Sequence, residues 1–240
     1  MKILADIHTH TIASGHAYST ITENIKAASE KGLKLIATTD HTEGMPGGAH
    51  AFHFANLRSL PDEIDGVKLL RGAEANIIDY EGHLDVDEEL LGELDMAIAS
   101  FHPPCIDFAD VETVTRGLEK VMQNPYISII GHPGDSRYPL DFERIVKMAK
   151  ATGTLLEVNN ASLKPTSFRP GVRESLIELL TYCKAYEMPV VLGSDAHHMS
   201  VVGGFEESIM LLEELDFPET LVLNTNLEAL VDFISQKRLK

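Results

Sequence analysis

Cysteine is scarce in this sequence: Cys105 and Cys183 are the only two in 240 residues, and no CxxC motif occurs. Two cysteines cannot build the disulfide framework of a small secreted protein, and a thiolate zinc or redox site needs more closely spaced cysteines. Long apolar runs are absent as well, and an aspartate and two histidines follow the short apolar stretch at the N-terminus. We therefore expect a cytoplasmic protein that makes no membrane contact.

Basic residues are also few. Lysine and arginine number 20 against 37 aspartates and glutamates, which gives a formal net charge of −17. This charge repels nucleic acid and anionic lipid at long range, so we expect no long nucleic acid as a partner, and a phosphorylated substrate would need positive charge supplied locally. With 44% hydrophobic and 24% charged residues and no Pro- or Ser-rich linker, we expect one globular domain over residues 1–240.

Tryptophan is absent, whereas histidine occurs 11 times. Histidine is the commonest metal ligand in proteins and a frequent proton-transfer group. The positions of the histidines along the chain are therefore the most informative feature of this composition.

Short β-branched runs alternate with helical patterns along the chain. The predicted strands begin near Ile3, Leu35, Val67, Met96, Ile127, Thr154 and Pro189. Their spacing of about 30 residues is that of a βα repeat. A capping box at Thr20 and Glu23 begins a first helix that Gly32 ends, and further helices are predicted over residues 111–123, 141–152, 172–186, 206–215 and 227–237. This pattern predicts an α/β fold.

Polar residues that can bind metal or form hydrogen bonds stand at the end of every predicted strand. An open doubly wound sheet concentrates its site at one switch point, whereas a closed barrel gathers the carboxyl ends of all its strands around one mouth. No Gly-x-Gly-x-x-Gly motif follows any predicted strand, which argues further against a dinucleotide-binding sheet. We therefore expect a barrel with its site at the C-terminal ends of the strands.

Nine of these residues are candidate metal ligands. They are His8, His10, His16, His41, Glu74, His102, His132, Asp195 and His197. For a single histidine a hydrogen-bonded loop position is the simpler interpretation, but repetition at five strand ends favours a metal site. One catalytic zinc takes about three protein ligands and a water, so this set indicates two or three metals. Nitrogen and oxygen donors suit Zn²⁺ best, with Mn²⁺ or Fe²⁺ as alternatives.

Four short motifs occur in order along nearly the whole chain. They are His8-Thr9-His10, Thr39-Asp40-His41, Gly131-His132-Pro133 and Ser194-Asp195-Ala196-His197. Together they resemble the motifs of the polymerase and histidinol phosphatase (PHP) family of metal-dependent phosphoesterases, and in particular its short, stand-alone bacterial phosphatases. The resemblance implies a distorted, TIM-like (β/α)7 barrel, in agreement with the seven predicted strands.

The resemblance also implies how the ligands are shared in a trinuclear centre. A first metal takes His8, His10, Glu74 and Asp195; a second takes Glu74, His102 and His132; a third takes His16, His41 and His197. Up to three Zn²⁺ ions per chain would share a bridging hydroxide that attacks phosphorus, so Glu74, Asp195 and His197 would act in catalysis through the metals. Asp40, next to His41, is expected to hold an imidazole or the hydrogen bonds of the site in orientation.

Substrate contacts are expected on the loops that follow the fifth and sixth strands. Arg137 or Arg169 could hold a phosphate with two hydrogen bonds, although a surface ion pair is the simpler interpretation for either. His198, beside a predicted ligand, is a candidate proton donor to the leaving group, with a solvated position as the simpler interpretation. Outside the site we place three histidines in polar loops and one acidic stretch on a solvated surface: His50, His53, His83 and residues 85–95.

The leading functional hypothesis is a zinc-dependent hydrolase that releases phosphate from a small phosphomonoester. A nuclease or phosphodiesterase acting on short nucleotides is the nearest alternative. A metal-dependent amidohydrolase is another, although no strand-end lysine is present to bridge its metals. A non-catalytic metal-binding protein would not need every ligand position filled. The apolar segment 227–233 packs either on the barrel or on a second copy of the chain, which leaves a homo-oligomer open.

Overall fold

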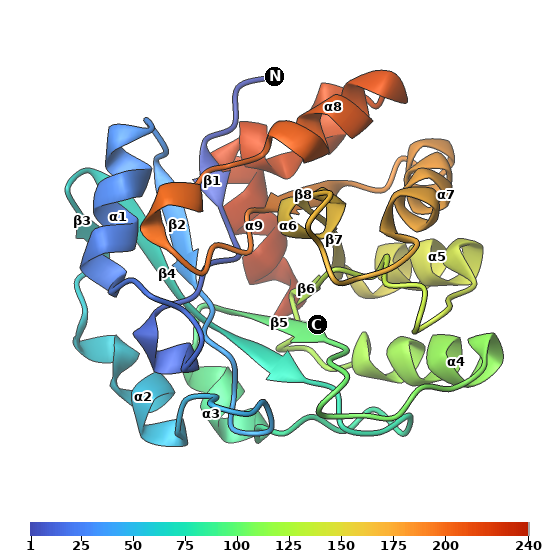
Figure 1. Ribbon diagram of the computed structural model, residues 1–240, viewed down its shortest axis with the longest axis horizontal. Coiled ribbons are helices and arrows are strands. Elements are labelled where there is room, and N and C mark those ends of the chain that lie inside the picture. Colours follow the sequence, from blue (N-terminus) through green and yellow to red (C-terminus); the bar gives the residue numbers. More distant parts are fainter. Residues whose placement is uncertain (240) are drawn as a thin grey trace.

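Seven parallel strands curve into a nearly closed barrel in the computed structural model, which describes residues 1–239 (Figure 1). In order around the sheet the strands are β1 (Ala5–Asp6), β2 (Leu35–Thr38), β4 (Val67–Asn76), β5 (Met96–Ser100), β6 (Ile129–Ile130), β7 (Leu155–Asn159) and β8 (Val190–Gly193). Each pairs in parallel with the next of these strands along the chain, which confirms the expected barrel. A short antiparallel strand that was not predicted, β3 (Glu63–Ile64), pairs with the start of β4.

Helices cover the outside of the barrel and connect its strands (Figure 1). They are α1 (Ile21–Glu30), α2 (Ala51–Asn56), α3 (Glu88–Glu93), α4 (Val111–Val121), α5 (Phe142–Thr152), α6 (Asn160–Leu163), α7 (Val172–Ala185), α8 (Glu206–Glu214) and α9 (Leu227–Lys237), with 3-10 turns η1 (Ile12–Ser14), η2 (Leu57–Ser59), η3 (Met199–Val201), η4 (Glu219–Leu221) and η5 (Leu223–Thr225). The five helices predicted beyond residue 110 match α4, α5, α7, α8 and α9 within two residues at each end. Within residues 1–239 no helix is both long and apolar enough to cross a membrane.

The start of α1 shows how the sequence fixes an element locally. Thr20 accepts a hydrogen bond from the Glu23 amide at 3.3 Å, and the Glu23 carboxylate accepts one from the Thr20 amide at 2.7 Å. These two bonds satisfy amide groups that have no partner inside the helix. The predicted capping box is therefore present, and it places α1 directly after the loop that carries the first histidines.

Apolar side chains pack on both faces of the barrel wall. Ile7, Ile98 and Val191 meet inside the barrel, while alternate residues such as Ile36 face outward beneath the helices. This alternation makes most of the barrel wall apolar, and the buried polar groups concentrate toward the strand ends, with Glu157 in the middle of β7 as an exception.

Helix α9 closes the end of the barrel at which the strands begin. Leu230 and Ile234 of this helix are buried in the same apolar cluster as the barrel interior, and Figure 1 shows α9 in the middle of the view, surrounded by strands and outer helices. The segment 227–233 therefore packs on the barrel, which was the first of its two expected alternatives.

The seam of the barrel lies between β1 and β8, the two ends of the strand order. Asn224 of η5 fills it: its side-chain oxygen accepts from the Leu192 amide at 2.7 Å, and its side-chain nitrogen donates to the carbonyls of Leu192 at 2.8 Å and Ala5 at 3.0 Å. Nearer the mouth, Thr9 and Ala196 form an isolated parallel bridge. A side-chain amide thus replaces part of a strand ladder, which is one source of the distortion that the family resemblance implied.

Candidate metal centre

The first two candidate ligands follow β1. His8 and His10 are both fully buried, and their Nε2 atoms lie 3.1 Å apart. They are two residues apart in extended backbone, so their side chains project toward the same side. The pairing that the sequence predicted for these imidazoles is therefore formed.

Glu74, near the end of β4, lies at the centre of the cluster. Its carboxylate is fully buried, and Oε2 lies 3.3 Å from His8 Nε2, 3.5 Å from His10 Nε2 and 2.9 Å from His41 Nδ1. One carboxylate oxygen therefore faces ring nitrogens that are delivered by two different strands.

The other oxygen of Glu74 faces the opposite half of the barrel. Oε1 lies 2.9 Å from His132 Nε2 and 3.4 Å from His102 Nε2, and it accepts a hydrogen bond from Ser100 Oγ at 2.6 Å. Because the two oxygens face different donors, this single carboxylate can serve two metal ions.

Asp195 follows β8 and approaches the same centre from the seam. Its Oδ1 lies 3.2 Å from His10 Nε2 and 3.7 Å from His8 Nε2, and its Oδ2 lies 3.2 Å from Arg169 Nη1. The backbone of Asp195 has φ of +53°, in the left-handed region that non-glycine residues seldom adopt. Such backbone strain persists where surrounding contacts hold it, commonly at functional sites.

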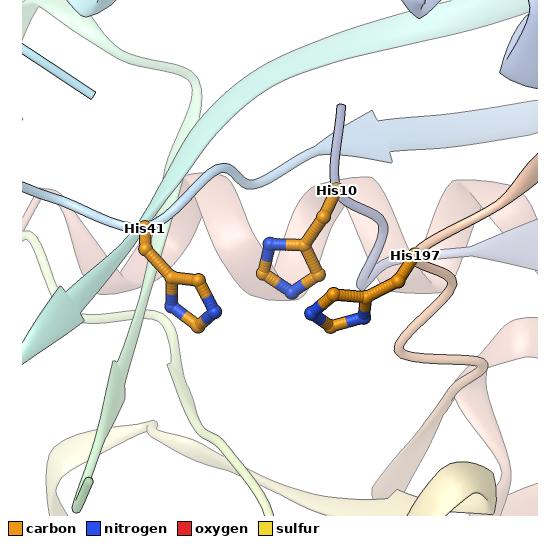
Figure 2. A group of neighbouring side chains, drawn as sticks. All are labelled: His10, His41 and His197. Carbon is orange, nitrogen blue, oxygen red and sulfur yellow. The ribbon is translucent and has the colours of Figure 1, made fainter. Parts of the chain in front are cut away.

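Figure 2 shows His10, His41 and His197 arranged around a common space, with ring nitrogens turned toward one another. One nitrogen from each ring lies within 4.8 Å of the others. The His16 ring lies beside them, with its centroid 5.0 Å from that of His41 and 4.9 Å from that of His197. The structure thus brings all nine predicted ligands to one place.

The candidate ligand atoms form compact groups that differ from the three ligand sets predicted from the sequence. Besides the trio in Figure 2, the compact groups are His8 with His10 and Glu74, and His41 with Glu74 and His102. His10 and His41 each belong to two groups, so they lie between the predicted sites. The assignment of individual ligands to individual ions stays a prediction.

Three buried polar atoms in the cluster make no hydrogen bond of acceptable geometry: His41 Nδ1, Glu74 Oε2 and His102 Nε2, although His41 Nδ1 and Glu74 Oε2 are only 2.9 Å apart. A buried polar atom without a partner costs about 1–3 kcal/mol, and native structures leave few of them. All three belong to one compact group of candidate ligands. A divalent cation accepts lone pairs from such imidazole and carboxylate atoms, so the residues present fit a metal.

Burial has the largest influence on the titration of the histidines. It lowers the pKa of His10 to about 3 and that of His102 to about 4, and neighbouring histidines add to both shifts. Burial also lowers the pKa of His8, but the charges of Glu157, Glu74 and Asp195 outweigh it, so that pKa lies well above its usual value. Two of these imidazoles are therefore neutral near pH 7, which is the form that binds metal.

The carboxylates show the opposite balance. Burial by itself would raise the pKa of Glu74 and of Asp195, but the surrounding histidines hold both well below the usual range. Both groups are therefore ionised across the physiological range. The centre combines two negative charges with several neutral nitrogens, a combination that attracts cations.

Asp40 does not touch a candidate ligand ring directly. It accepts from the Thr11 amide and hydroxyl at 2.7 Å each and from Ser14 Oγ at 2.6 Å. Ser14 Oγ in turn accepts from the His41 amide at 3.1 Å and lies 3.4 Å from His10 Nδ1. Asp40 therefore reaches the ligands through Ser14.

Two placements outside the site were wrong. His53 lies on α2, and its Nε2 is 3.1 Å from Asp40 Oδ2, so it belongs to the hydrogen-bond network behind the ligands. Asp85, placed on a solvated surface, accepts from Thr42 Oγ1 at 2.6 Å and from the Asn76 amide and side chain. Local sequence gave no sign of these contacts, because both depend on how loops from different strands meet.

Besides Ser14, two residues that contact ligand rings were missed. Asn76 Oδ1 accepts from His102 Nδ1 at 2.7 Å, and Glu157 Oε1 accepts from His8 Nδ1 at 2.7 Å. A signal existed for each. Asn76 stands two residues after Glu74 on the same strand, and Glu157 is the one charged residue in the buried strand β7.

A cavity of about 520 Å³ opens above the cluster. Its lining includes four candidate ligand histidines, Asp195, and residues of the loop between α6 and α7: His16, His41, His102, His197, Lys164, Thr166, Ser167, Phe168 and Arg169. Arg169 donates to Ser162 Oγ at 2.9 Å and to Asp195 at 3.2 Å. The structure thus places Arg169 between the metal cluster and the cavity.

The other predicted substrate contacts lie elsewhere. Arg137 forms an ion pair with the buried Asp135 at 2.6 Å and does not itself line this cavity, so its contact with substrate stays a prediction. His198 is exposed and pairs with Ser200. His50 and His83 are also exposed and contact no candidate ligand among the described bonds.

These features define a (β/α) barrel protein with a metal site of histidines and carboxylates at the strand ends. A model of the PHP domain matches residues 6–237, so the chain belongs to the PHP family, as its four motifs suggested.

Relatives match the chain along its whole length. A protein of Caldanaerobacter subterraneus subsp. tengcongensis is 45% identical over 99% of this chain and 93% of its own, and one of Acetivibrio thermocellus is 45% identical over 99% and 98%; both are described as probable phosphatases. The fold is also that of a histidinol phosphate phosphatase from Lactococcus lactis, crystallised with zinc, L-histidinol and phosphate. That structure has a TM-score of 0.60 and 16% identity, over 89% of this chain and 94% of the other.

Proposed function

We propose that this protein is a metal-dependent phosphatase that releases phosphate from a small phosphomonoester, with up to three Zn²⁺ ions bound by the nine ligand residues. The observation that carries the proposal is the convergence of those residues on Glu74, with unpartnered buried donor atoms among them. The probable phosphatases related to this chain over its full length, and the zinc and phosphate bound by the L. lactis protein, support the same reading.

The residues present suit the chemistry of phosphate ester hydrolysis. Divalent ions held here would supply Lewis acidity, which neutralises phosphoryl oxygens and makes a water molecule acidic enough to attack phosphorus. Glu74 would hold two ions through its two oxygens, and Asp195 would bind one ion while its Oδ2 anchors Arg169. Arg169, which lines the cavity, would then donate a hydrogen bond to a phosphoryl oxygen of the bound substrate.

The cavity favours a small substrate. Its volume of about 520 Å³ lies within the usual range of small-molecule sites, about 300–1,000 Å³. Lys164 and Arg169 line it, and they supply positive charge locally in a chain whose formal net charge is −17. We therefore propose a small phosphorylated molecule as partner, with no role for a long nucleic acid or a membrane.

The test is phosphate release from a panel of phosphomonoesters by protein of known metal content, by its chelated form and by an Asp195→Ala variant. Asp232→Ala, which removes an exposed aspartate on α9, is the matched control. We expect turnover only where both the metal and Asp195 are present, and full activity in the control. Metal-loaded protein that releases no phosphate, or a fully active Asp195→Ala variant, would contradict the proposal; cleavage of short oligonucleotides or amides instead would favour one of the alternative hydrolases.

A further inference from the structure

We propose that Glu157 is a positioning residue of the metal centre: its carboxylate holds two ligand residues, His8 and His132, in the orientation in which they bind metal. This inference rests on the metal centre of the proposed function but on no particular substrate. Glu157 itself is not among the nine candidate ligands. It contacts His8 Nδ1 and the His132 amide, which are not the atoms of these residues that face the cluster.

The contact with His8 fixes the state of the imidazole. Glu157 Oε1 lies 2.7 Å from His8 Nδ1, and both side chains are fully buried. Carboxylate oxygens accept hydrogen bonds, so in the neutral His8 that binds metal the ring proton resides on Nδ1. The lone pair of Nε2 is then available on the side that faces the cluster, where Nε2 lies 3.3 Å from Glu74 Oε2. A carboxylate behind a histidine is a recurrent way to orient a metal ligand.

The contact with His132 holds a strained backbone. Glu157 Oε2 accepts from the His132 amide at 2.7 Å. His132 has φ of +31°, in the left-handed region, which carries a free-energy cost for a residue with a side chain. The hydrogen bond helps to offset that cost and keeps His132 Nε2 at 2.9 Å from Glu74 Oε1.

The neighbouring backbone leaves room for the Glu157–His8 pair. A Cβ atom added to Gly193 on β8 would lie 2.0 Å from Glu157 Oε1 and 2.7 Å from His8 Cβ. No larger residue fits there without displacing one partner. Glycine at position 193 of β8 therefore allows the Glu157 carboxylate to lie against this strand.

A carboxylate is needed because both of its oxygens accept hydrogen bonds. Glutamine has the same shape but offers one oxygen and one NH₂ group. In a Glu157→Gln variant either His8 Nδ1 or the His132 amide would therefore face a donor. His8 could relieve that conflict only by moving its proton to Nε2, which would block the atom that faces the metals.

The test compares Glu157→Gln with Asp6→Asn. Asp6 is an equally buried carboxylate on β1 that accepts from the amides of His8, Ser194 and Gly203 but contacts no ligand ring. We would measure zinc affinity and stoichiometry by competition with a chromophoric chelator, and melting temperatures with and without zinc. Glu157→Asp keeps both acceptor oxygens and serves as the conservative variant.

We expect Glu157→Gln to weaken zinc binding about 10–100-fold and to shrink the rise in melting temperature on adding zinc. Glu157→Asp should lose less, and Asp6→Asn should change the metal-free melting temperature while its zinc affinity stays within about threefold of wild type. NMR of the His8 ring should show a shift of the proton away from Nδ1 in Glu157→Gln.

The inference is overturned if Glu157→Gln binds zinc like wild type, or if Asp6→Asn loses as much affinity, since a general effect on the barrel would then explain both. Should Glu157→Gln fail to fold, NMR of the zinc-loaded wild-type protein decides: a His8 ring with no proton on Nδ1 would overturn the inference. If the wild-type protein takes up no zinc, the proposed metal centre itself is contradicted. If the protein binds zinc normally but releases no phosphate, only the proposed activity is contradicted.

Discussion

Arg169 and Asp195 form a buried ion pair at the boundary between the metal cluster and the cavity, with Nη1 and Oδ2 3.2 Å apart. The two side chains come from different βα loops, those that follow β7 and β8. One member is a candidate metal ligand and the other lines the substrate cavity. The pair therefore joins the part of the site that would hold metal to the part that would hold substrate.

Replacing Arg169 with methionine should reduce kcat/KM for phosphomonoesters by about 10–100-fold, mainly through KM, because a charge-assisted hydrogen bond contributes about 1.5–3 kcal/mol. Zinc content should remain near that of wild type. Arg137→Met is the control, because Arg137 pairs with Asp135 outside the cavity, and it should lose less than about threefold. Equal losses in the two variants, measured by steady-state kinetics, would show that Arg169 has no special part in binding phosphate.

Removing metal should lower the melting temperature as well as activity. A ligand that binds only the folded protein at 100 times its Kd stabilises it by about 2.7 kcal/mol. For a chain of this length that corresponds to a shift of roughly 5–11 °C. Calorimetry of the chelated and zinc-restored protein measures the shift. The same melting temperature in both forms would argue against metal binding by the buried cluster.

The chelated protein should lose stability as pH falls from 6.5 to 4. The folded-state pKa is about 3 for His10 and about 4 for His102, below the ordinary 6.5, so the unfolded chain takes up protons first. The stability these groups contribute is complete above pH 6.5, and His102 alone accounts for about 3 kcal/mol of the loss. The pKa of His8 is raised, so the stability that His8 contributes is fully present below pH 6.5. His8 therefore does not offset the loss of stability between pH 6.5 and 4.

Urea unfolding of the chelated protein at several pH values checks this prediction. A His102→Asn variant is the control, because it lacks one of the two groups and should show a shallower dependence on pH. Stability that stays constant between pH 6.5 and 4.5 would mean that these histidines are not held neutral in the fold.

Replacing Asn224 with alanine should destabilise the protein by about 3 kcal/mol. The change removes three hydrogen bonds at the seam and leaves the Leu192 amide and two carbonyls buried without partners. Asn226→Ala is the matched control: Asn226 is exposed and only caps α9, so its loss should cost about 1 kcal/mol. Denaturant unfolding distinguishes the two, and equal costs would mean that Asn224 does not close the barrel.

Much of the fold and the ligand set could be predicted because the relevant signals are local. The alternation of β-branched runs with helical patterns marks βα units within about 30 residues, and parallel strands bring their carboxyl ends to one mouth. Residues as far apart as His8 and Asp195 could therefore be placed together without knowing any contact between them. The same reasoning did not predict the contact of His53 with Asp40. His53 lies on α2, in the connection between β2 and β4, and the hydrophobic periodicity does not specify the path of that connection.

The sequence by itself determined which chemical groups stand at the strand ends, and hence that nitrogen and oxygen donors converge there. Only the tertiary structure decided how those groups share partners: Glu74 between several imidazoles, Glu157 behind His8 across 149 positions of sequence, and Asn224 in the seam. The physical reason is the directionality of hydrogen bonds and ion pairs. They depend on distances of a few tenths of an ångström between side chains on different strands, which the composition of any one strand does not specify.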